Sequence, residues 1–307
     1  MNKFAATNNK IEPFTISKPM NFRLIAILFL FIATQSFSQS SGPSNSKYDK
    51  SKEIGLLAGT AYYLGEINPY KHFGTELKLA GGLSFRNNFN KRWTFKTSVL
   101  FGQVEAYDSK SDDPWIRNRN LHFRNQFLEG SMQFELNYFQ YQIGSRDWIS
   151  PYLFMGLSYT AMRPQAKYNG VWYELQPLGT EGQGTSEGGT KYSTNIVSIP
   201  LGVGVKVNIW KIFGFSVEWG IRRTFTDYFD DISGTYVDPE ILRDENGAAA
   251  ATLADQSIIP QGTNGNNTGY QRGDPGRKDL YFFVLGSLNI RIDKKATSCW
   301  NGHVLTP

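Results

Sequence analysis

Only a few residues in this sequence are of the types from which catalytic or metal sites are built. The 307-residue chain has one cysteine, Cys299, and three histidines, which are His72, His122 and His303. One cysteine excludes a disulfide framework and leaves no zinc cage of cysteines, and the wide spacing of the histidines argues against a histidine-rich metal site. The sequence therefore predicts no metal site and no cofactor.

His122 is the histidine with the most suitable neighbours for catalysis. Hydrolysis or transfer of a lipid acyl group needs a histidine together with a serine and an acid. Asp112 and Asp113 precede His122, but the sequence places no serine with it. We therefore expect no catalytic residue, and we expect that the protein is not an enzyme.

Acidic residues gather in one late segment of the chain. Asp227, Asp230 and Asp231 are followed by Asp238 and Glu240. Carboxylate oxygens are the usual protein ligands of calcium. The segment lacks a recognisable ligand spacing, which favours a solvated loop held by turn hydrogen bonds, and the sequence leaves calcium binding open.

The N-terminal segment has the organisation of an export signal. An apolar run, Leu24–Ala33, follows a stretch with four basic residues and one acidic residue, and it precedes the small residues Ser36 and Ser38. The run is too short to span a bilayer, and its flanking regions are ordered as in a signal peptide. Residues 1–38 are therefore predicted to be a cleaved signal peptide, with translation starting at either of the first two methionines.

The basic balance of the whole chain belongs mainly to this signal. The chain has 32 Lys and Arg against 27 Asp and Glu, which gives a net charge of +5. Beyond residue 38, 28 basic and 26 acidic residues remain, so that the net charge falls to +2. Such a weak basic balance gives no reason to expect a nucleic-acid partner.

The remainder of the chain shows apolar and polar residues in alternation, which is the pattern of β-strands with two different faces. No stretch after the signal is long and apolar enough for a transmembrane helix, whereas strands of this length can cross a bilayer at a tilt. The predicted strands are 53–64, 76–86, 93–106, 121–138, 149–162, 195–210, 213–224 and 278–292.

The connections between these strands alternate in kind. The short ones are 86–92, 139–147 and 211–214, and the long ones are 65–74, 107–120, 163–192 and 226–277. Short turns at one rim and long loops at the other are typical of outer-membrane barrels, and the aromatic residues near the strand ends are typical of interfacial girdles. Each strand taken singly would also fit a soluble β-sandwich.

The combined pattern predicts an all-β fold, an eight-stranded antiparallel up-and-down transmembrane β-barrel with long extracellular loops and short periplasmic turns. The predicted organisation is a signal peptide (1–38), a short periplasmic linker (39–52), the barrel (53–293) and a C-terminal tail (294–307), whose role is left open. The predicted location is the outer membrane of a Gram-negative bacterium, with outer-membrane lipids as partners.

The inward faces of the predicted strands carry charges of both signs. A barrel of eight strands is filled by its own side chains, and buried charges persist when they are paired. The sequence therefore predicts lumenal ion pairs rather than an open channel, and places function on the loops and rims. The candidates for these pairs are Arg86, Lys96, Glu129, Glu135, Glu218 and Arg222, with Lys78 also on an inward face.

Four sequence phrases go beyond generic barrel composition. They are Tyr62–Pro69, Asn118–Arg124, Lys167–Gly184 and Glu218–Tyr236. Together they resemble the PorG-like outer-membrane β-barrel family of the type IX (Por) secretion system, over about residues 53–292. The resemblance implies a non-enzymatic component of that protein-export machine, in contact with its periplasmic ring lipoprotein. The alternative is a stand-alone structural or adhesive barrel without a role in secretion.

The last phrase leads from a strand into the longest loop, where several residues could form either a rigid docking surface or a motif that stabilises the barrel. Glu218 and Arg222 would point inward, and the residues after them would enter the loop, where Asp and Gly-containing turns are expected. The loop candidates are Thr226, Asp227, Tyr228, Asp230, Asp231, Ser233, Gly234 and Tyr236.

Overall fold

The computed structural model describes residues 50–69, 71–73, 76–262 and 264–293. The predicted signal peptide, most of the predicted linker and the tail lie outside the described residues. The first strand begins at Ser51, within the segment that the sequence assigns to the linker.

Eight long strands close into one antiparallel barrel in the described part of the chain, which confirms the predicted fold class. Each strand pairs with its neighbours in chain order, and the first pairs with the last to close the barrel. The strands are β1 (Ser51–Leu64), β2 (Lys78–Asn88), β3 (Trp93–Tyr107), β4 (His122–Asn137), β5 (Ile149–Tyr168), β7 (Asn195–Asn208), β8 (Phe213–Thr224) and β9 (Leu280–Arg291).

A short strand, β6 (Val171–Glu174), pairs only with the end of β5, beyond the barrel wall. Asn169 and Gly170 form the turn between them, with φ angles of 49° and 85°. Asn-Gly is the residue pair that favours this left-handed hairpin turn, so the sequence contains a local signal for the extension of β5 past the predicted end at residue 162.

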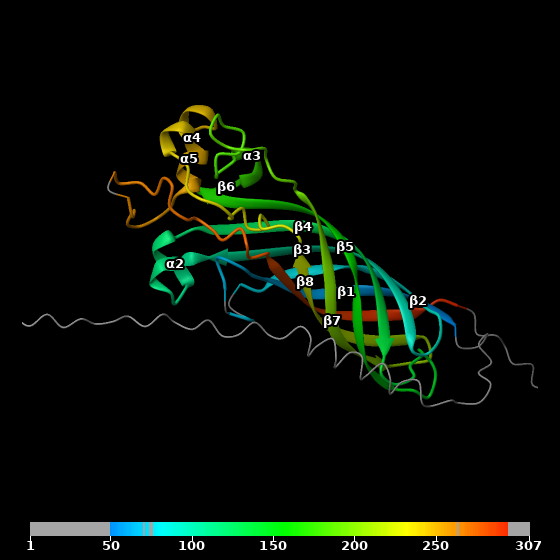
Figure 1. Cartoon of the computed structure of the whole chain (residues 1–307). Coiled ribbons are helices and arrows are strands. Elements are labelled where there is room, and N and C mark those ends of the chain that lie inside the picture. The colour runs from blue at the N-terminus through cyan, green and yellow to red at the C-terminus, as the bar shows by residue number, and fades with distance from the viewer. Residues whose placement is uncertain (1–49, 70, 74–75, 263, 294–307) are drawn as a thin grey trace, which may run out of the picture. The chain divides into compact units, whose positions relative to one another are not determined.

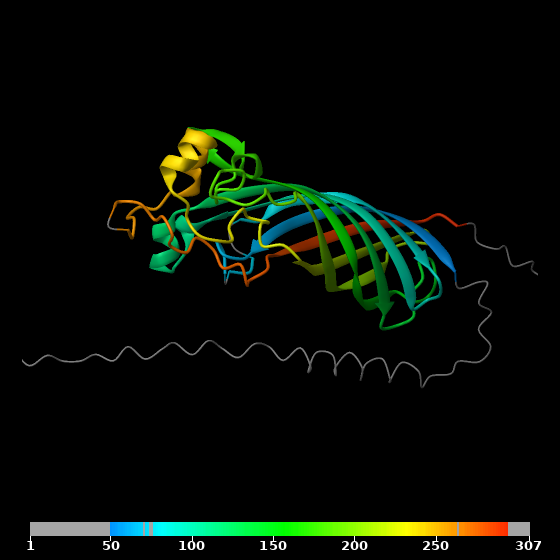
Figure 2. The same ribbon diagram turned by 45° about the horizontal axis from the view of Figure 1, so that its top comes forward.

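Within the described residues, the long connections carry five short helical segments. The two views show these segments gathered beyond one end of the barrel (Figures 1 and 2). None of the described helices is long and apolar enough to cross a membrane. The segments are η1 (Asp108–Lys110), α2 (Pro114–Arg119), α3 (Leu175–Leu178), α4 (Pro239–Glu245) and α5 (Ala248–Ala254).

The two rims of the barrel differ. The β2–β3, β4–β5 and β7–β8 connections are turns at one rim, where β1 begins and β9 ends. The four long loops meet at the other rim, which we call the long-loop rim (Figure 1). The alternation of short and long connections in the sequence therefore corresponds to the two ends of the barrel.

The outer wall carries a continuous apolar belt. Leu128, Met132 and Phe134 on β4 point outward, and each is more than half exposed. Met155 and Leu157 on the neighbouring β5 are equally exposed. Proteins surrounded by water rarely expose apolar surface of this extent, whereas an outward apolar band is the lipid-facing surface of outer-membrane barrels.

The belt ends at a defined level on β3 and β4. Phe101 pairs with Leu128 at that level, and the next outward pair is Gln103 with Gln126, joined by a hydrogen bond of 3.0 Å. Arg124 occupies the next outward position along β4, and its guanidinium donates to the Gln165 side chain. The ends of β3, β4 and β5 therefore continue as a polar wall between the belt and the long-loop rim.

Aromatic side chains mark the edge of the belt at the short-turn rim. Trp93, Tyr138, Trp148 and Trp210 lie at or beside the turns and are all exposed. Aromatic residues at this level form the interfacial girdle of outer-membrane barrels, because their rings are apolar and their polar atoms can meet lipid headgroups.

Candidate functional site

Charged side chains fill the half of the lumen nearer the short turns. Each belongs to an inward position of its strand, and each is at most 3% exposed. Three are acidic and three are basic, so this lumenal cluster carries no net charge in its ionised form. Its members are Glu53, Arg86, Lys96, Glu135, Lys206 and Glu218.

Glu135 is the centre of the lumenal cluster. Its carboxylate oxygens lie 3.1 Å from Arg86 Nε, 2.6 Å from Lys206 Nζ and 3.6 Å from Lys96 Nζ. Lys96 Nζ also lies 2.7 Å from Glu218, linking the two acids. Lys96 and Glu135 lie on the neighbouring strands β3 and β4. The contacts of Glu135 with Arg86 and Lys206, and of Lys96 with Glu218, run between strands that are not neighbours, and they therefore cross the lumen.

A second pair lies closer to the long-loop rim. Arg222 Nη2 and Glu129 Oε1 are 3.3 Å apart, and the Tyr281 hydroxyl donates to the other Glu129 oxygen at 2.7 Å. The Arg222 guanidinium also lies 4.5 Å from the ring centroid of Phe283. The six predicted lumenal residues are thus divided between two groups. Glu53 and Lys206 were not among the predicted lumenal residues. The alternation of apolar and polar residues along their strands could have indicated their inward positions.

Above these charges, the β8–β9 loop inserts an aromatic plug into the barrel mouth. Phe229 is fully buried and stacks on Tyr281 with ring centroids 4.8 Å apart. It also packs against Phe127 and Tyr63, and Ile232 belongs to the same buried cluster. The lumen is therefore occupied by apolar rings at one end and by paired charges at the other.

A filled lumen predicts that the protein does not conduct ions. The full chain reconstituted in planar bilayers is expected to give no steady current, because buried side chains fill the interior of a barrel of eight strands. A Phe229→Ala variant should also remain closed, since the charged cluster is unchanged. A steady, ohmic current from the unaltered protein would contradict this.

The loop candidates of the last sequence phrase hold the long loops together. Asp231 accepts a hydrogen bond from the Tyr192 hydroxyl at 2.6 Å and lies 3.7 Å from Arg272 Nη2. The backbone N–H groups of Ser233 and Gly234 donate to the Glu181 carboxylate. These contacts connect the β8–β9 loop with the β5–β7 loop.

The remaining candidates of this phrase also contact neighbouring segments. Tyr228 stacks on Tyr192 with ring centroids 4.5 Å apart, and its N–H donates to the Thr226 hydroxyl. The Tyr236 N–H donates to the Tyr270 carbonyl at 3.0 Å. Most of the phrase is buried, and these contacts hold the loop segments to one another.

A group of buried acids lies beside the plug. One carboxylate oxygen from each of Glu66, Asp230 and Asp279 lies within 4.8 Å of the other two. The Tyr63 hydroxyl is 2.5 Å from Asp230 and 2.7 Å from Asp279. Burial raises the pKa of Glu66 to about 7, with a further contribution from the Asp227 charge. Burial also raises the pKa values of Asp230 and Asp279 well above their usual range.

The acidic run in the sequence is therefore divided in space. Asp230 joins Glu66 and Asp279, whereas Asp231 faces Arg272 and Asp238 caps α4 by accepting from the Glu240 N–H. Sequence reasoning missed Glu66 and Asp279 because they lie far along the chain from the run. Glu66 belongs to the first resemblance phrase, which was the only available signal.

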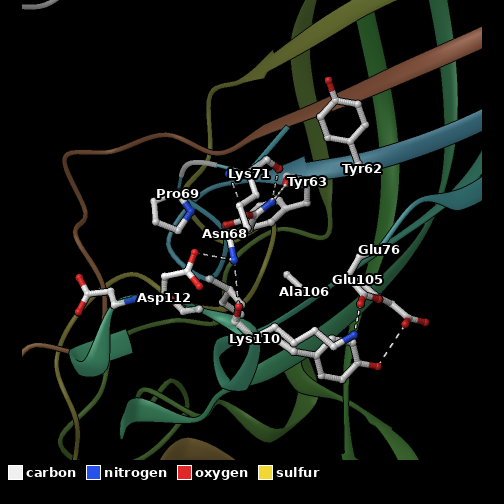
Figure 3. A pocket seen from close by; sticks show the side chains of 14 residues that line it. Tyr62, Tyr63, Asn68, Pro69, Lys71, Glu76, Glu105, Ala106, Lys110 and Asp112 are labelled. Atoms are coloured by element: carbon white, nitrogen blue, oxygen red, sulfur yellow. Dashed lines mark hydrogen bonds and ion pairs between the residues drawn. The ribbon is translucent and has the colours of Figure 1, made fainter. Parts of the chain in front are cut away.

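A pocket of about 380 Å³ lies between the β1–β2 and β3–β4 loops (Figure 3). Tyr62, Asn68 and Lys110 are among its lining residues, and Lys71 and Asp112 in its wall form an ion pair of 2.9 Å. The volume is sufficient for a small ligand, but the charged groups of its wall already contact one another.

Two of the histidines lie in the described part of the chain, and both contact neighbouring side chains or backbone. His122 Nε2 accepts from the Lys167 N–H at 2.9 Å, and its ring stacks on Tyr107. Burial lowers the pKa of His122. His72 lies 3.4 Å from the Tyr62 hydroxyl, and His303 lies outside the described residues.

Comparison with protein families identifies a match over residues 42–246, from before β1 to beyond α4, with the model described as "Domain of unknown function (DUF6089)". The chain belongs to this family. A comparison with curated proteins gives no match.

Several solved structures resemble the DUF6089 chain at low sequence identity. Neisserial surface protein A is 11% identical, with coverage of 79% of this chain and 99% of that chain and a TM-score of 0.37. The outer membrane protein OprG of Pseudomonas aeruginosa is 8% identical, covering 80% and 99%, with a TM-score of 0.37. The N-terminal β-barrel domain of OprF from the same organism is 7% identical, covering 78% and 99%, with a TM-score of 0.35.

Proposed function

We propose that this protein is a non-enzymatic outer-membrane component of the type IX secretion system, and that it docks a periplasmic ring lipoprotein of that machine. The observation that carries the proposal is a closed, filled barrel built from the sequence phrases that resemble the PorG-like family. Such a barrel offers no path for cargo, so it would act by holding a partner.

The apolar belt and its aromatic girdle support a location in the outer membrane. The outward side chains of β4 and β5 would face lipid, and the exposed tryptophans at the short-turn rim would lie at the interface. The same orientation would direct the long loops outward and the short turns toward the periplasm.

The short-turn rim is the surface that a periplasmic partner would reach. Its β4–β5 turn is held by an ion pair of 3.1 Å between Lys91 and Asp147 and by the Asn208 side chain, which donates to the Gln142 carbonyl. Exposed side chains at this rim include Trp210 and Lys211. A rim with fixed turns can bind a partner without a large ordering cost.

Deletion of the gene in a strain with type IX export is expected to block secretion of type IX cargo while the outer membrane stays intact. A photo-crosslinking residue at Lys211 should capture the ring lipoprotein, and the same residue at Ile259 on the long-loop rim should not. Normal export in a clean deletion strain would refute the proposal.

A stand-alone structural or adhesive barrel is the second candidate. The observation that favours it is an apolar surface on the long-loop rim, where Trp115, Ile258 and Ile259 are 56%, 65% and 69% exposed. Normal export, together with no crosslink at Lys211 and reduced surface attachment of the deletion strain, would favour this function.

A further inference from the structure

Four buried carboxylates meet at the long-loop rim from separate parts of the chain. Glu66 belongs to the β1–β2 loop, Asp227 and Asp230 belong to the β8–β9 loop, and Asp279 directly precedes β9. Their exposed fractions are 9%, 3%, 1% and 0%. The group is independent of the lumenal cluster and of the proposed docking rim.

We propose that Glu66, Asp230 and Asp279 bind a divalent cation, with Asp227 beside them, and that Ca²⁺ is the ion that fits. The donors are all oxygens, which is the ligand type that Ca²⁺ prefers. Calcium–oxygen distances are about 2.3–2.6 Å, so two ligands on opposite sides of an ion are about 4.6–5.2 Å apart. The three oxygens lie within 4.8 Å of one another and can therefore all reach one ion.

The charges at this site are not balanced by the protein. Within the described residues, no lysine or arginine nitrogen forms an ion pair with any of the four carboxylates. The Arg119 guanidinium lies near but pairs with Asp108 at 2.7 Å. Buried carboxylates without a cationic partner are costly unless a proton or a bound cation neutralises them.

Unsatisfied oxygen atoms give a second, independent indication of a missing ligand. Glu66 Oε2 and both carboxylate oxygens of Asp227 are buried and accept no hydrogen bond from the described residues. Burial raises the pKa of Asp227, and Ser233 opposes this shift without completing a hydrogen bond to the carboxylate. Asp227 lies within electrostatic range of Glu66 and Asp279, and its charge raises the pKa of both carboxyls.

Asp231, in the same loop, is a buried acid whose carboxylate has partners from the protein itself. Its carboxylate receives hydrogen bonds from Thr180 and Tyr192 and faces Arg272. The protein thus supplies donors and a cationic partner for Asp231, whereas no ion pair within the described residues reaches the Glu66 group.

A bound ion would hold the aromatic plug around Phe229 in the barrel mouth. Phe229 lies next to Asp230, and the Phe229 N–H donates to Asp279 Oδ2 at 3.0 Å. One ion held by Glu66, Asp230 and Asp279 would therefore connect the β1–β2 loop, the plug and the start of β9.

The test uses the full chain in detergent micelles, depleted of cations with a chelator and titrated with CaCl₂ by calorimetry. We expect one Ca²⁺ per chain, and weaker binding of Mg²⁺, which requires a smaller octahedral site. The double variant Glu66→Gln/Asp279→Asn should lose at least about tenfold in calcium affinity, because affinity follows the number of charged ligands.

The matched control is Asp238→Asn, which changes an acid of the same loop and keeps an N-cap for α4. It should retain the affinity of the unaltered protein. If the double variant fails to fold, Tb³⁺ luminescence sensitised by Tyr63 in the unaltered chain gives an independent measurement, with displacement by CaCl₂ expected. No calcium binding by the unaltered chain, or equal affinity in the folded double variant, would overturn the proposal.

Discussion

Replacing Glu135 with glutamine is expected to lower the free energy of unfolding by about 3–5 kcal/mol, the usual effect of breaking a buried ion pair. Glu135 contacts Arg86, Lys96 and Lys206, and all four side chains are at most 3% exposed. Glutamine has nearly the same shape but no charge. The variant would therefore leave three buried cations facing the two remaining acids of the lumenal cluster.

Equilibrium unfolding of the barrel in guanidinium chloride, followed by tryptophan fluorescence, measures this change. The matched control is Asp147→Asn, because Asp147 pairs with Lys91 at 3.1 Å but both side chains are nearly 30% exposed. Surface pairs of this kind contribute about 0–1 kcal/mol. Equal losses in the two variants would show that the lumenal cluster has no special role.

A second substitution in the lumenal cluster distinguishes two possible causes of the lost stability, namely unbalanced charge and altered packing. Adding Lys206→Met to Glu135→Gln removes one cation and keeps apolar volume, so part of the lost stability should return. A double variant that is less stable than Glu135→Gln alone would contradict the assignment to unbalanced charge.

In the presence of a chelator, the stability of the long-loop rim is expected to fall as pH rises from about 4.5 to above 7. The pKa of Glu66 is raised from 4.5 to about 7 because the side chain is buried beside Asp227. A carboxyl with a raised pKa binds its proton more tightly in the folded state, so its contribution is complete below the unfolded pKa and is lost as pH rises through the folded pKa. The loss from Glu66 alone should be roughly 1–3 kcal/mol.

Asp230 and Asp279 should extend this loss to higher pH, because their pKa values are raised in the same direction. Two groups oppose the shift at Glu66, namely the Arg119 charge and the Asp274 N–H, which donates to the Glu66 carboxylate. Neither is sufficient to reverse the shift.

Limited proteolysis of the long loops across this pH range measures the effect. Glu66→Gln should flatten part of the profile, because glutamine cannot lose a proton, and Asp112→Asn on the exposed surface should leave the profile unchanged. Loop protection that increases with pH in the chelated protein would show that the sign is wrong.

The barrel itself could be predicted from the sequence because the strand signal is local. A period of two assigns each residue to one of two faces without knowledge of its partners, and the lengths of the connections indicate which rim each belongs to. The inward positions of Arg86 and Glu135 follow from this alternation alone. The extension of β5 to Tyr168 was also encoded locally, by the Asn169–Gly170 turn that follows it, although this turn signal lay inside a segment assigned to a loop.

The partners of the inward charges could not be predicted in this way. Arg86 on β2 meets Glu135 on β4 across the lumen, and that contact depends on the closure and register of the whole barrel. Alternation gives the face of a residue, but it does not give the residue opposite it.

The grouping of the buried acids at the long-loop rim was even less predictable from the sequence. Glu66 and Asp279 are distant in sequence from Asp230, and only barrel closure brings the ends of β1 and β9 together beside the β8–β9 loop. The sequence by itself determined the strands, their faces and the charge signs in the lumen, because these depend on neighbouring residues. The tertiary structure decided which acids meet and which are paired with a cationic side chain, because those properties depend on contacts between distant segments.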